Sequence, residues 1–143
     1  MNIEISFRVE KAILKCWVSG DRNPQYMRQY WQEILNKCRK EKLERILVTL
    51  GLQGVYQRFE GLQAFQNVIR TLQFSNIAIG LTDLNEHSSA DTKMACHMAA
   101  VKNILVTYVE SEAEASEWFN SQARLTPECI VSRASTLTPQ RGV

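Results

Sequence analysis

Residues 45–65 read RILVTLGLQGVYQRFEGLQAF and contain two different hydrophobic patterns. The first six residues, RILVTL, form a short continuous apolar run, which is typical of a central strand buried on both faces. Beyond this run, apolar residues recur at helical spacing, and they are Val55, Phe59, Leu62, Phe65, Ile69 and Leu72. The stretch therefore predicts a buried strand, a turn that contains glycine, and a helix that packs on the sheet.

The residues before this stretch predict a β-hairpin followed by a helix. In residues 3–9, apolar and polar side chains alternate, as they do in a half-buried strand, and residues 12–18 supply the second strand after a tight turn. Asn23 is suited to cap the amino terminus of a helix, and Pro24 is suited to the first helical position. The helix that follows carries one apolar stripe between Tyr26 and Cys38.

The residues after this stretch predict two more strands and two more helices. Residues 76–82 and 103–109 are apolar enough to be strands, and a short helix is expected between them at residues 90–101. Ser111 and Glu114 have the spacing of a capping box, which predicts the start of a last helix. The complete order is β-β-α-β-α-β-α-β-α.

This order predicts an α/β domain whose mixed, largely parallel sheet has helices packed against it. We expect one domain over residues 1–122. Residues 123–143 contain two prolines and many serines and threonines, so we expect a mostly irregular tail there.

The composition is that of a globular protein, with 45% hydrophobic and 22% charged residues among 143. A net charge of +2 is too small to indicate a nucleic-acid partner. No apolar run approaches the ~20 residues of a membrane span, and the start of the chain does not resemble a signal peptide, so we expect a cytoplasmic protein without membrane insertion. Four cysteines without paired spacing predict free, buried thiols; they are Cys16, Cys38, Cys96 and Cys129.

Together with the element order, several residues resemble the SpoIIAA-like STAS family, whose fold is that of bacterial anti-sigma factor antagonists. In a branch of small stand-alone bacterial members of unknown function, a strand like RILVTL precedes a glycine and a helix that opens with Arg-Phe-Glu. Gly54, Arg58, Phe59 and Glu60 stand in those places here, and SEAEASEWF resembles the closing helix of that branch. The resemblance covers roughly residues 3–121 and implies a STAS fold with a role in regulation or signal transduction.

The family's best understood mechanism is phosphorylation of a serine that follows the third strand. The corresponding interval here, GLQGVYQRFEG, contains neither serine nor threonine. The phosphorylation switch that the resemblance implies therefore does not carry over to this sequence.

Two segments are candidates for binding a protein partner. They supply the residues Gln53, Tyr56, Arg58 and Glu60, and the residues Asp83, Glu86 and His87. A structural role stays open for both segments, because Arg58 could pair with a carboxylate on the helix surface and Asp83 could serve a turn. Both segments are expected at the same edge of the sheet.

The sequence contains no motif that predicts catalysis, a cofactor or a metal site. The stretch GLQG lacks the lysine and hydroxyl of a phosphate-binding loop, so we expect its glycines to allow positive φ at the strand exit. Asp83, Glu86 and His87 share one loop, without a second His or Cys cluster to complete a metal site. Cys96 and His97 are adjacent on a helix and point about 100° apart, which prevents them from acting as nucleophile and base.

We therefore expect a non-catalytic protein-interaction module, either as a monomer or as a homodimer. The alternative is a protein that binds a small molecule, such as a nucleotide or an apolar ligand. Its pocket would lie between the second and third helices, where Met94 and Met98 would form a polarisable wall. Both methionines are expected on the inward face of residues 90–101, together with Val101.

Overall fold

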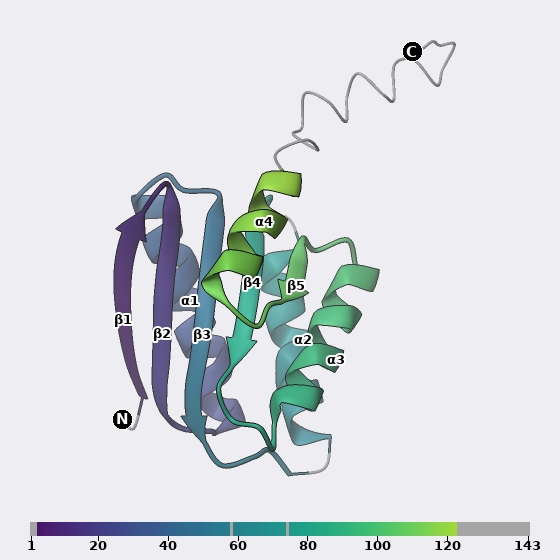
Figure 1. Cartoon of the computed structure of the whole chain (residues 1–143). Helices are drawn as coiled ribbons and strands as arrows, with labels where there is room; N and C mark the ends of the chain where they lie inside the picture. The colour runs from purple at the N-terminus through teal and green to yellow at the C-terminus, as the bar shows by residue number, and fades with distance from the viewer. Residues whose placement is uncertain (1–2, 58, 74, 123–143) are drawn as a thin grey trace, which may run out of the picture. The chain divides into compact units, whose positions relative to one another are not determined.

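Figure 1 shows the computed structural model, which describes residues 3–57, 59–73 and 75–122. The expected tail over residues 123–143 and the candidate residue Arg58 lie outside the described residues. By their contacts, the residues of the chain divide into two units, Met1–Glu110 and Ser111–Val143.

The chain begins with the expected β-hairpin. Strands β1 (Ile3–Glu10) and β2 (Ile13–Asp21) are antiparallel, with Ile3 opposite Gly20 and Glu10 opposite Ile13. The two turn residues, Lys11 and Ala12, both have positive φ, at 54° and 62°. Positive φ at both central residues is the type I′ geometry, whose twist matches that of the two strands.

The sheet has five strands in the order β1-β2-β3-β4-β5, so each strand pairs with the one before it. Strands β3 (Arg45–Gln53), β4 (Ala78–Asp83) and β5 (Val106–Tyr108) continue the sheet from β2, and all these pairings are parallel. The α/β class and the mixed, largely parallel sheet are therefore confirmed.

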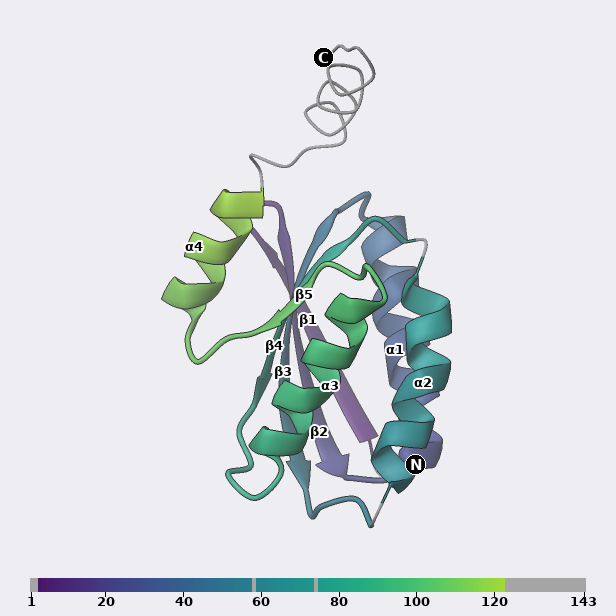
Figure 2. The same cartoon turned by 90° about the vertical axis from the view of Figure 1, so that its right-hand side faces the viewer.

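Three helices cover one face of this sheet. Helices α1 (Pro24–Lys40), α2 (Glu60–Leu72) and α3 (Ser89–Val101) each connect two neighbouring parallel strands. Right-handed crossovers between strands in sequential order place all the connecting helices on the same side, and Figure 2 shows the three helices together there. Their amino termini consequently lie at the edge where the parallel strands end.

The core lies between the sheet and these helices. Alternate residues of the central strands point into it, as the period of a strand requires; they include Leu14, Cys16, Val18, Ile46, Val48, Ile79 and Leu81. Helix α1 contributes the predicted stripe, and Asn23 caps it by accepting a hydrogen bond of 2.9 Å from the amide of Gln25. Cys16, Cys38 and Cys96 are free and buried, as expected, while Cys129 lies outside the described residues.

The start of α2 differs from the prediction. The helical pattern placed Val55 and Phe59 on an inward stripe, but the helix begins only at Glu60, and both side chains are exposed. Gly54 has φ of 88°, as expected for a glycine at the strand exit, and Phe59 has φ of 63°. Two residues with positive φ interrupt helical geometry, so the apolar spacing before residue 60 does not reflect a helix.

The inward face of α3 also differs from the prediction. Met94 is 55% exposed and Val101 is exposed as well, whereas the buried residues are Thr92, Cys96 and Ala99. These side chains are smaller than methionine, so the helix can approach the sheet closely. The expectation failed because the apolar residues of α3 are not confined to one face, so their spacing does not identify the buried side.

The second unit contains helix α4 (Glu112–Gln122). The amide of Glu114 donates a hydrogen bond of 3.1 Å to the Ser111 hydroxyl, as in the predicted cap. None of the helices in the described parts of the chain combines the length and apolar character needed to cross a membrane.

Candidate functional site

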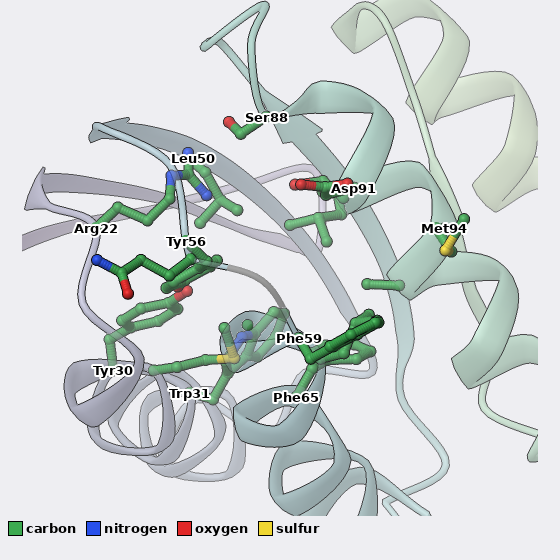
Figure 3. Close-up of a pocket in the computed structure, with 17 residues that line it drawn as sticks. Arg22, Tyr30, Trp31, Leu50, Tyr56, Phe59, Phe65, Ser88, Asp91 and Met94 are labelled. Atoms are coloured by element: carbon green, nitrogen blue, oxygen red, sulfur yellow. The ribbon is translucent and has the colours of Figure 1, made fainter.

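A cavity of about 320 Å³ lies at the edge where β3 and β4 end, beneath the amino-terminal turns of α1, α2 and α3. We call it the aromatic pocket, because its wall includes the aromatic residues Tyr30, Trp31, Tyr56, Phe59 and Phe65; Met94 lines it as well (Figure 3). Ligands of open α/β sheets gather outside the carboxyl ends of the strands. The cavity has this location, and its volume is at the lower end of the ~300–1,000 Å³ range of ligand pockets.

Arg22 holds one side of the pocket in place. The Arg22 guanidinium forms an ion pair of 3.0 Å with Asp83, and the two side chains are 2% and 0% exposed. The same guanidinium donates to the carbonyl oxygen of Gly54 at 2.8 Å. Arg22 therefore connects the loop after β2 with the loop after β3 and with the end of β4.

The Asp83 carboxylate accepts three further hydrogen bonds. Two come from the hydroxyl groups of Ser88, at 2.8 Å, and Thr92, at 2.7 Å, and the third comes from the amide of Asn85 at 3.0 Å. Together with Arg22, these donors contact both oxygens of the carboxylate and fix its orientation. Because these hydrogen bonds and the ion pair with Arg22 already use the carboxylate, Asp83 organises the loop before α3 and is not available as a general base.

Tyr56 forms the part of the wall that lies against the first turn of α2. Its ring lies so close to Gly61 that a Cβ atom on Gly61 would be 2.4 Å from Tyr56 Cδ2. The Arg22 guanidinium lies 5.5 Å from the centre of the same ring, within the range of a cation–π contact. The position of the tyrosine ring thus depends on the absence of a side chain at residue 61.

The hydroxyl of Tyr56 is buried and has no hydrogen-bond partner among the described residues. Burial raises the pKa of Tyr56 above its ordinary value, against the opposing effect of the Arg22 charge. Burial also raises the pKa of Tyr30 well above its ordinary value, and the neighbouring Tyr56 adds to this effect. Both phenols therefore stay neutral near pH 7, and the pocket holds polar hydroxyl groups without a phenolate.

The structure separates the candidate residues into an inner and an outer group. Asp83 and the Tyr56 hydroxyl are buried, whereas Gln53 and Glu60 are exposed. Glu86 and His87 are exposed too, and their side chains lie 3.7 Å apart. Asp83 therefore does not join these two residues in one acid–base or metal-binding group.

The two predicted segments do lie side by side at one edge of the sheet. The Asn85 side chain donates a hydrogen bond of 3.0 Å to the carbonyl oxygen of Gly54, and the amide of Leu84 donates one of 2.9 Å to that of Leu50. This part of the prediction is confirmed.

The predicted methionine wall is confirmed only in part. Met94 lines the aromatic pocket, but Met98 lines a separate groove between α2 and α3, together with Ile69 and Val101. The two methionines are one helical turn apart, and the cavity lies under the first turns of α3 only.

Sequence reasoning missed Arg22 as a site residue and identified Tyr30 and Trp31 only as core residues. Arg22 belongs to the sequence SGDRN, which lies between the second predicted strand and the first predicted helix. This position at the carboxyl end of a strand was the signal that could have marked Arg22 as a site residue. Its partner Asp83 follows 61 residues later, so the pair could not be identified from local patterns.

Comparison with known proteins adds no identification, since no protein-family model matches the chain and no curated protein matches it.

Proposed function

We propose that this protein binds a small, largely apolar molecule in the aromatic pocket. The observation that carries this proposal is the cavity itself, whose wall is mostly aromatic and aliphatic and lies at the strand-end edge of a parallel sheet. Packed interiors leave few voids larger than a water molecule, and unfilled apolar space reduces stability. A ligand that fills the cavity would gain the contacts that the aromatic side chains lack.

The polar residues near the cavity support binding rather than chemistry. Arg22, Ser88 and Thr92 all line the pocket, yet each already contacts the Asp83 carboxylate. Such a network holds the loops in one arrangement, and a pre-organised pocket loses little conformational entropy when a ligand binds.

Protein docking is the second candidate. It is favoured by the contact between the loops after β3 and β4, which places the exposed residues Gln53, Glu60, Glu86 and His87 at one edge of the sheet. Tyr56 and Asp83 do not contribute polar groups to this surface, because the Tyr56 hydroxyl and the Asp83 carboxylate are buried.

We also propose that the chain is a member of the STAS family. The N-terminal hairpin and the alternating order of strands and helices support this resemblance.

Binding can be tested with N-phenyl-1-naphthylamine, a neutral apolar dye whose fluorescence rises when it leaves water. We expect saturable fluorescence with the full chain. Ala95 lines the pocket, so Ala95→Phe should fill it and remove dye binding. Ala100 is exposed on the same helix, and Ala100→Phe is the matched control that should bind normally.

Circular dichroism should show that both variants keep the native helix content. Dye fluorescence that never saturates, or that both variants show equally, would argue against a ligand in this pocket. Capture of a protein partner that depends on Gln53, Glu60, Glu86 and His87 would then favour docking.

A further inference from the structure

We infer that the ligand of the aromatic pocket is an organic amine, with an aromatic or aliphatic body inside the cavity and its ammonium group at Asp91. This inference rests on the proposed function and adds the chemical class of the ligand. Asp91 lies in the first turn of α3 and lines the cavity. Figure 3 shows its carboxylate at the cavity between Tyr56 and Met94.

The Asp91 carboxylate has no cationic partner in the part of the chain that the structure describes. The ion pairs of those residues involve other carboxylates, including Asp83 and Glu110. Lys93, two residues later on α3, pairs with Glu110 at 3.4 Å and not with Asp91. The charge of Asp91 is therefore available to a group that enters the pocket.

Among the described residues that line the pocket, Arg22 is the other charged one, and the carboxylate of Asp83 balances its charge. It forms the buried ion pair with Asp83 and donates to the carbonyl oxygen of Gly54. A ligand carboxylate would have to replace these contacts to reach the guanidinium, and it would also meet the like charge of Asp91. The amino-terminal dipole of α3 is equivalent to about half a positive charge, so it offsets only part of the Asp91 charge.

Aromatic rings complete the environment that a cation needs. Tyr56 and Phe59 line the same cavity, and the face of an aromatic ring attracts a cation through its quadrupole. An ammonium group at Asp91 would pair with this carboxylate in a cavity whose wall also holds aromatic rings, and its apolar body would occupy the part lined by Phe65.

The test uses four compounds with one carbon skeleton: butylbenzene, 4-phenyl-1-butanol, 4-phenylbutylamine and 4-phenylbutanoate. Their affinities for the full chain are measured by displacement of N-phenyl-1-naphthylamine. Asp91 is exposed, so we expect the amine to bind about 3- to 10-fold more tightly than butylbenzene, as one exposed charge pair and one cation–π contact would give. The carboxylate should bind most weakly.

Two variants assign the effect to Asp91. Asp91→Asn should remove the advantage of the amine and leave the affinity for butylbenzene unchanged. Glu86→Gln removes an equal charge from an exposed residue that does not line the pocket, and it should change none of the affinities.

Equal affinity for the amine and butylbenzene, or an amine preference that survives Asp91→Asn, would overturn the inference and leave the proposed pocket intact. If none of the four compounds displaces the dye and the dye itself does not bind, the proposed function fails, and the inference fails with it.

Discussion

Arg22 and Asp83 are separated by 61 residues in the sequence, yet they form a 3.0 Å ion pair whose two side chains are buried. Removal of one partner of such a pair leaves the other charge buried without compensation. We expect Arg22→Ala and Asp83→Ala each to lower the free energy of unfolding by about 3–5 kcal/mol in urea denaturation.

The exposed pair of Lys37 and Glu41 is the control for this prediction. Their charged atoms are 3.9 Å apart at the carboxyl end of α1, and Glu41→Ala, which leaves the contact of Lys37 with the Phe7 ring in place, should cost no more than about 0.5 kcal/mol. Losses of equal size at the two pairs would mean that burial of Arg22 and Asp83 has no energetic effect.

Two tyrosine hydroxyl groups should respond differently to removal. The Tyr56 hydroxyl is buried without a described partner, so Tyr56→Phe should leave stability unchanged or raise it by about 1 kcal/mol. The Tyr108 hydroxyl donates to the Asp83 carbonyl oxygen at 3.1 Å and accepts from the Asp83 amide at 3.2 Å. Tyr108→Phe should therefore cost about 0.5–1.5 kcal/mol. A larger loss for Tyr56→Phe than for Tyr108→Phe in thermal denaturation would contradict this assignment.

The exposed position of Phe59 predicts a small effect of its truncation. Its side chain is 63% exposed, so Phe59→Ala should change the free energy of unfolding by less than about 1 kcal/mol. Phe65 is buried one turn into α2, and Phe65→Ala should cost about 3–5 kcal/mol. If the two variants lost equal stability, Phe59 would belong to the core after all.

Gly61 and Tyr56 should be energetically coupled. Alanine in place of a helical glycine gains about 1 kcal/mol of helix propensity, but a Cβ atom at residue 61 would collide with the Tyr56 ring. Gly61→Ala should therefore destabilise the native chain and stabilise the Tyr56→Ala variant. A double-mutant cycle measures this coupling, and an effect of Gly61→Ala with the same sign in both backgrounds would disprove it.

The buried thiols predict a loss of stability in alkaline solution. Burial raises the pKa of Cys16 and Cys96 from about 9 in the unfolded chain to about 12 in the fold. Each thiol's contribution to stability is complete below pH 9 and is lost as the pH rises toward 12.

The burial of these two thiols also predicts slow chemical labelling. Iodoacetamide should label both thiols slowly at pH 8 and rapidly in denaturant, as read by mass spectrometry of the peptides. Rapid labelling of the native chain would show that these thiols are accessible.

Periodicity was sufficient to predict the order of strands and helices, since the apolar runs and stripes are local properties of the sequence. It was not sufficient for the pocket, which depends on contacts between distant segments. The helical spacing counted from Val55 would put Tyr56 within a helix, but Gly54 and Phe59 have positive φ, and the Tyr56 ring lies against Gly61. Arg22 was missed because its role depends on Asp83, and spacing alone does not show which loops meet at an edge of the sheet.

The sequential order of the strands bears on how the chain folds during synthesis. Each strand pairs with the strand made just before it, so the sheet can grow one strand at a time as the chain leaves the ribosome. At about 5–20 residues per second, Asp83 is made about 3–12 s after Arg22. Arg22 has no Asp83 to pair with during that interval, and the ion pair can form only when β4 has joined the sheet. The pocket is therefore completed only after strands β1 to β4 have paired, because α3, which supplies part of its wall, follows β4 in the chain.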